Sequence, residues 1–90
     1  MPDYNIVFWT NVKRYQKLRG YSDADMAKLL GQSTSTYKTS KSDMVGTGIR
    51  RLGLYTEALD VSAVDLVEEW TDDEWDAYVK DRESDDLRSI

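Results

Sequence analysis

Two glycines, each followed two positions later by a serine, divide the first half of this 90-residue chain into short segments. Gly20 and Gly31 suit the left-handed conformation that ends a helix, and Ser22 and Ser33 suit the position that caps the next one. The whole chain contains one proline, and its apolar residues recur at helical rather than alternating spacing. The sequence therefore predicts an all-α protein of five or six short helices.

The predicted helices cover residues 6–19, 22–30, 33–41 and 47–59, then a short helix capped by Ser62 and an acidic C-terminal helix over residues 70–84. Thr47 is the predicted cap of the fourth helix, and Thr71 opens the last one with Glu74 three positions on, the pattern of a capping box. Residues 85–90 are expected to fray. The helical spacing predicts an apolar core of Phe8, Val12, Tyr15, Met26, Ala27, Leu30, Tyr37, Leu52, Tyr55, Leu59 and Leu66.

The chain contains neither cysteine nor histidine. This excludes disulfides, zinc-finger sites, thiol nucleophiles and imidazole bases. Secreted proteins of this size normally carry disulfides, so we expect a reducing, cytoplasmic location. The segment "MPDYNIVFWT" lacks the basic and apolar regions of a signal peptide, and no apolar run approaches the roughly 20 residues that span a bilayer, so no membrane association is expected.

Charge is divided unequally along the chain. Residues 1–51 hold nine Lys and Arg against four Asp and Glu, a net charge of +5. Residues 52–90 hold three Lys and Arg against thirteen Asp and Glu, a net charge of −10. The first half is suited to meet a polyanion, and the second half would repel one.

Hydroxyl side chains crowd the third predicted helix. Six of the nine residues from Ser33 to Lys41 are Ser or Thr, and Tyr37 is the one large residue suited to anchor the segment. A two-turn helix with one anchor does not persist alone, so it must lie against the first two helices. Its outer face is either an ordinary solvated surface or a polar surface that fits a partner.

Four segments in unbroken order resemble the helix-turn-helix domain of phage repressors and Cro proteins, the XRE type: "NVKRYQ", "GYSDADMAKLLGQS", "STYKTSKSD" and "EALDVSAVDLV". The resemblance implies a lambda-repressor-like domain over residues 1–69, with the helix-turn-helix at about 22–41. In this family the second helix of the motif enters the major groove and dimers read two half-sites. It therefore implies a small DNA-binding transcriptional regulator whose partners are double-stranded DNA and a second copy of the chain.

The resemblance also implies which residues contact DNA. Base contacts fall on hydroxyl residues of the recognition helix, namely Ser33, Thr34, Ser35 and Thr39. Contacts near the phosphates fall on Lys38, Lys41 and Ser42, and the basic side of the first helix adds Lys13 and Lys17.

Several positions depart from the family pattern. Asp23 stands where the family has a glutamine that holds a phosphate, and a carboxylate there would repel DNA. Gln16 and Lys41 stand where the family often has an Arg–Glu ion pair. The recognition helix has no Arg, Asn or Gln for bidentate base contacts, so sequence readout should be weak or supplied by DNA shape.

These departures favour a second hypothesis, in which the same scaffold binds a protein such as a repressor or a toxin. The chain would then be a modulator of a repressor, an antirepressor or an antitoxin. A continuous positive face over the lysines of the first and third helices favours DNA. Interruption of that face by Asp23 and Asp25 favours a protein partner.

Neither an enzyme nor a metal or cofactor site is expected. The acidic residues at 72–76 lie in the first turn of a helix, where carboxylates act as caps and dipole partners, and they lack the pattern of a calcium loop. No nucleophile or glycine-rich loop accompanies them. Trp9, Trp70 and Trp75 are predicted core or docking residues. They suggest that the last helix either folds back onto the first or packs on a partner.

Overall fold

The computed structural model describes the backbone of residues 3–88 and the side chains of residues 3–81. Over this range it contains six helices and no strand, which confirms the predicted all-α class. The helices are α1 (Tyr4–Arg19), α2 (Asp23–Leu30), α3 (Thr34–Asp43), α4 (Ile49–Leu59), α5 (Ala63–Val67) and α6 (Asp72–Arg88). No helix in the described residues is both long enough and apolar enough to cross a membrane.

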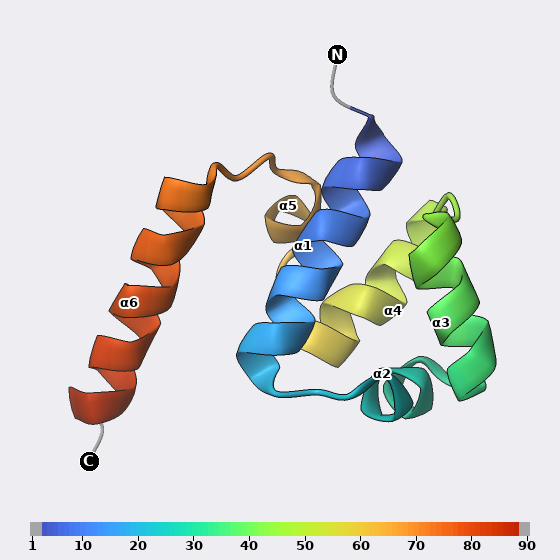
Figure 1. Ribbon diagram of the computed structural model, residues 1–90, viewed down its shortest axis with the longest axis horizontal. Coiled ribbons are helices and arrows are strands. Elements are labelled where there is room, and N and C mark those ends of the chain that lie inside the picture. The colour runs from blue at the N-terminus through green and yellow to red at the C-terminus, as the bar shows by residue number, and fades with distance from the viewer. Residues whose placement is uncertain (1–2, 89–90) are drawn as a thin grey trace.

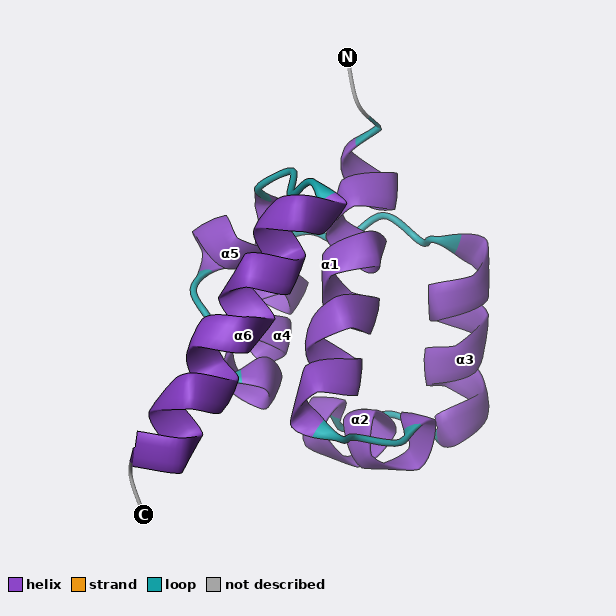
Figure 2. Ribbon diagram, turned by 60° about the vertical axis from the view of Figure 1, so that its left-hand side comes forward, coloured by secondary structure: helices purple, strands orange, loops and turns teal. Residues whose placement is uncertain are grey.

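Helix α1 runs through the middle of the molecule and packs against α4 and α5, while α2 packs against α3 and α4 (Figure 1). Helices α3 and α6 lie on opposite sides of α1 in both ribbon views (Figures 1 and 2). The hydroxyl-rich helix and the acidic helix are therefore far apart on the surface.

The two glycines end helices and the two serines cap the helices that follow, as the sequence predicts. Gly20 and Gly31 are left-handed, with φ of 72° and 71°. Ser22 and Ser33 accept hydrogen bonds from the backbone N–H groups of Asp25 and Thr36. These caps fix where α1 and α2 end and where α2 and α3 begin.

The boundaries of α3 and α4 differ from the prediction. Helix α3 continues two residues further, to Asp43, so Ser42 lies inside its last turn rather than in a loop. The predicted cap at Thr47 is wrong, because Gly48 takes the extended N-cap conformation and α4 begins at Ile49 without a side-chain cap. Glycine is tolerated at this position, although it gives less stability than Ser or Thr would.

The first and last helices of the chain are longer than predicted. Helix α1 begins at Tyr4, because the Asp3 side chain accepts a hydrogen bond from the Asn5 N–H and caps it. Helix α6 reaches Arg88, past the predicted end at residue 84 and into the segment that was expected to fray. Residues 89 and 90 lie outside the described residues.

The core forms where α1, α2, α4 and α5 meet the buried ring of α3. Every predicted core residue is buried except Leu52, which is half-buried and packs against the others. The core also contains Trp9 and Ala58, together with two buried polar residues, Asn11 and Gln16.

Helix α6 packs on α1 through aromatic rings, which confirms that the last helix folds back onto the first. The Trp75 and Tyr78 rings lie 5.0 Å and 6.0 Å from the Tyr15 ring. Arg14 adds a bond of 2.7 Å from Nη2 to Asp72 Oδ1. Trp9 takes no part in this contact, since its ring faces Tyr37 and Tyr55 instead.

Replacing Asp60 with glycine is expected to stabilise the fold by up to about 1 kcal/mol, because a non-glycine residue is strained in the left-handed conformation. Asp60 is exposed and ends α4 with φ of 56°. Glu57→Gly, in the exposed interior of α4, is the matched control and should destabilise by about 1 kcal/mol. Urea unfolding measures the free energy of unfolding of both variants. A loss of stability in Asp60→Gly would contradict the left-handed conformation of residue 60.

Candidate functional site

Helices α2 and α3 form a compact unit at the edge of the molecule. A turn of three residues, Gly31 to Ser33, joins them, and α3 lies on the outside in both ribbon views (Figures 1 and 2). Within α3, Tyr37 is the one side chain classed as buried. The rest of this helix therefore presents a polar, hydroxyl-rich surface.

The predicted DNA-contacting residues fall into three groups. Ser35, Lys38, Thr39 and Ser42 on α3, and Lys13 and Lys17 on α1, are exposed; Thr34 and Lys41 are half-buried. Ser33 is exposed but occupied as a cap: its hydroxyl accepts from the Thr36 N–H at 3.1 Å and donates to Thr36 Oγ1 at 2.7 Å. The exposed group remains available to a partner.

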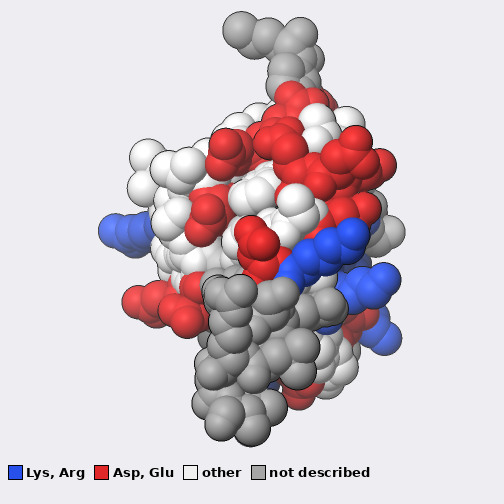
Figure 3. All heavy atoms as spheres, turned by 90° about the vertical axis from the view of Figure 1, so that its left-hand side faces the viewer, with Lys and Arg blue, Asp and Glu red and all other residues white. Residues whose placement is uncertain are grey.

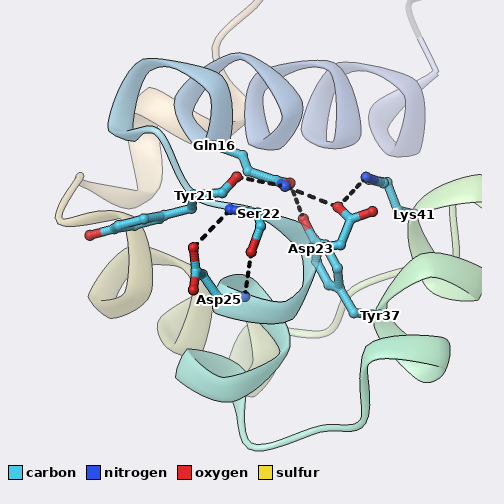
Figure 4. Close-up of polar contacts among 7 residues, drawn as sticks. All are labelled: Gln16, Tyr21, Ser22, Asp23, Asp25, Tyr37 and Lys41. Carbon is cyan, nitrogen blue, oxygen red and sulfur yellow. Dashed lines mark hydrogen bonds and ion pairs between the residues drawn. The ribbon is translucent and has the colours of Figure 1, made fainter.

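A polar network behind this surface links three helices (Figure 4). The Tyr37 hydroxyl donates to Gln16 Oε1 at 2.6 Å, and Gln16 Nε2 donates to Asp23 Oδ1 at 3.0 Å and to the Tyr21 carbonyl at 3.1 Å. Lys41 Nζ lies 2.5 Å from the same Asp23 oxygen. The network fixes α3 against α1 and the start of α2.

The electrostatics of the network follow from burial and partners. Burial raises the pKa of the Tyr37 phenol, so this group stays protonated and donates. The hydrogen bond from Gln16, followed by the bond and charge of Lys41, lowers the pKa of Asp23. Asp23 is therefore ionised at neutral pH and paired within the protein.

This pairing changes two expectations from the sequence. Asp23 is not an isolated carboxylate facing outward, because Lys41 and Gln16 bind it. Gln16 and Lys41 stand where the resembled family often has an Arg–Glu ion pair. Here the two residues are linked through the Asp23 carboxylate, which binds both. The exposed Asp25 carboxylate accepts from the Ser22 N–H at 3.0 Å, so it forms part of the capping box at the start of α2.

The basic residues of α1 divide into two pairs. Arg14 donates to Asp72 and to the Trp70 carbonyl, and Arg19 donates to the carbonyls of Leu59 and Asp60. Both arginines thus hold the fold together.

Lys13 and Lys17 instead share an open pocket of about 290 Å³ with Gln16, Tyr21 and Lys41. Lys38, one turn before Lys41 on α3, is near enough to contribute to the lowered pKa of Asp23.

Acidic side chains gather on the side of the molecule that carries α6 (Figure 3). The exposed acids between α5 and the first turns of α6 are Glu68, Glu69, Asp72, Asp73, Glu74 and Asp76. Among the residues with described side chains, no group of three acids is placed to hold a metal ion. The acidic region belongs to the side opposite α3.

Two buried polar residues were missed by sequence reasoning. Gln16 organises the network, and Asn11 Nδ2 donates to the carbonyls of Leu66 and Glu68 at 2.8 Å each, closing the end of α5. Their spacing could have indicated their burial, because residues three or four places apart lie on one face of a helix. Asn11 follows the apolar Phe8 by three places, and Gln16 follows the apolar Val12 by four.

Comparison of this chain with protein-family models, with curated proteins and with solved structures finds no match.

Proposed function

We propose that this protein is a small DNA-binding transcriptional regulator of the phage repressor and Cro type, with α3 as the recognition helix in the major groove. The observation that carries the proposal is the α2–turn–α3 unit. A short capped helix meets a second helix through Gly31, Gln32 and Ser33, and the second helix offers an outward polar face with one buried anchor. This arrangement suits entry into a groove that is lined by hydrogen-bonding base edges and phosphates.

The distribution of charge supports the same proposal. Lys13 and Lys17 on α1 lie beside the end of α3, and Lys38 is exposed on α3 itself. The acidic residues of α5 and α6 lie on the opposite side, where they would face away from DNA. Lysine contacts to the phosphate backbone provide most of the affinity in such complexes, and the hydroxyl groups provide modest selectivity.

A second candidate function is binding to another protein through the same scaffold. The Asp23–Lys41 pair favours it, because it neutralises one of the four lysines that would meet DNA. Exposed apolar side chains favour it also, above all Ile49, which is 91% exposed at the start of α4. Under this proposal the partner would be a repressor or a toxin.

Replacing Lys38 with alanine tests the DNA proposal. Each phosphate contact contributes about 0.9 to the slope of log affinity against log salt, so this variant should bind more weakly and with a slope up to about one unit flatter. Lys80→Ala removes the same charge from an exposed position on α6, which lies across α1 from α3 (Figure 1), and is the matched control for Lys38. Fluorescence anisotropy with a mixed-sequence duplex measures both; equal effects of the two changes would contradict the placement of α3.

A further inference from the structure

The pocket between α1 and the end of α3 has a composition that suits an anion. Its lining comprises Lys13, Lys17, Lys41, Gln16 and Tyr21, and its volume is about 290 Å³, room for a phosphate group with part of its hydration shell. Three ammonium groups and one amide therefore surround a space that is open to solvent.

The positive charge in this pocket is only partly balanced. Lys41 pairs with Asp23, whereas Lys13 and Lys17 make no hydrogen bond or ion pair with any side chain described in residues 3–81. These two lysines are four residues apart on one side of a helix, where like charges destabilise each other. An anion between them would remove that repulsion.

Asp23 already occupies the donors that an anion would use. Gln16 Nε2 and Lys41 Nζ both bind Asp23 Oδ1, at 3.0 Å and 2.5 Å. Both of these residues also line the pocket. The Asp23 carboxylate thus accepts from two of the residues that line this cationic pocket.

We propose that this pocket is a phosphate-binding site in which Asp23 competes with the ligand for Lys41. When a phosphate group enters between Lys13 and Lys17, the Lys41 ammonium moves from the Asp23 carboxylate to a phosphate oxygen. Inorganic phosphate and pyrophosphate carry more negative charge than one carboxylate, which favours the exchange. A backbone phosphodiester carries the same single charge as a carboxylate, so there the attraction of the two further lysines favours the exchange. The identification of the ligand as a backbone phosphate of DNA rests on the proposed function; the chemistry of the pocket does not.

Asp23 lowers the affinity of this site in two ways. It holds Lys41 before the ligand arrives, and it leaves a like charge beside the ligand afterwards. Asp23→Asn removes the charge and keeps an acceptor oxygen for Gln16, so it should tighten binding on the order of tenfold. Lys17→Ala should weaken binding by a similar factor. Lys28→Ala, at an exposed position of α2, should leave it unchanged.

The test is a titration followed by NMR, with the Gln16 side-chain amide as the reporter. Wild type, Asp23→Asn, Lys17→Ala and Lys28→Ala are each titrated with inorganic phosphate, with pyrophosphate and with a mixed-sequence duplex. We expect all three ligands to shift the Gln16 amide. The affinities should fall in the order Asp23→Asn, then wild type and Lys28→Ala together, then Lys17→Ala.

The titrations with different ligands distinguish the phosphate pocket from DNA binding. A response to phosphate and pyrophosphate without duplex binding would support the pocket and contradict DNA binding. Duplex binding with an unmoved Gln16 amide, or equal affinities of Lys17→Ala and Lys28→Ala, would overturn the pocket and leave DNA binding standing. Folding of each variant is checked from the dispersion of its backbone amide signals.

Discussion

Replacing Trp9 with alanine is expected to lower the free energy of unfolding by about 3–5 kcal/mol, the range for removing a large aromatic side chain from a packed core. The Trp9 ring is 1% exposed. It contacts the rings of Phe8 and Tyr55 edge-on, with centroids 5.3 Å and 5.6 Å away. The loss approaches the whole stability of a domain of this size, so the variant should be partly unfolded at room temperature.

The indole N–H gives Trp9 a second role. Its Nε1 donates to the Val45 carbonyl at 3.0 Å and ties α1 to the loop between α3 and α4. Trp9→Phe keeps an aromatic ring but loses this bond and some volume, so it should cost less, about 1–3 kcal/mol. Guanidinium unfolding followed by circular dichroism measures both variants. A loss below 1 kcal/mol in Trp9→Ala would contradict the packing of α1 against α4.

Removing three lysines together should have the largest effect on DNA binding. If Lys13, Lys17 and Lys38 each neutralise one phosphate, the triple alanine variant should have a salt slope flatter by about 2.7 and an affinity about 500-fold lower at about 0.1 M salt. All three side chains are exposed, so the fold should be unaffected. Anisotropy titrations across a series of salt concentrations measure the slope and the affinity together.

The matched control for this variant changes charge elsewhere. Lys28, Lys80 and Arg50 are also exposed, and replacing all three with alanine removes the same net charge from α2, α6 and α4. This control should bind with a smaller loss and a slope close to that of the wild type. If both triple variants lose affinity equally, net charge rather than the surface of α1 and α3 drives binding.

The sequence predicted the helices well where local chemistry sets their ends. Gly20 and Gly31 adopt the left-handed conformation, and Ser22, Ser62 and Thr71 cap the helices that follow them, because these preferences depend on a few adjacent atoms. The cap of α4 was wrong because two candidates, Thr47 and Gly48, stand side by side and the packing of the preceding loop decides between them.

The candidate site was predicted less completely. The hydroxyl-rich face of α3 and the exposure of Lys38 follow from helical periodicity alone. The Gln16–Asp23–Lys41 network does not. The resemblance placed Gln16 and Lys41 at the positions of a family ion pair, but it did not predict that Asp23 would bind both of them. The different uses of Arg14 and Lys13, neighbours in sequence, likewise depend on where α6 lies.

The most direct test of the account is the affinity of the unmodified protein for a mixed-sequence duplex between about 50 and 200 mM salt. With Lys13, Lys17, Lys38 and Lys41 each neutralising about one phosphate, the slope of log affinity against log salt should lie near −3 to −4. Binding that is measurable at the lowest salt and falls along this slope is the predicted result. No detectable affinity at the lowest salt, in protein shown to be folded, would contradict the DNA-binding proposal.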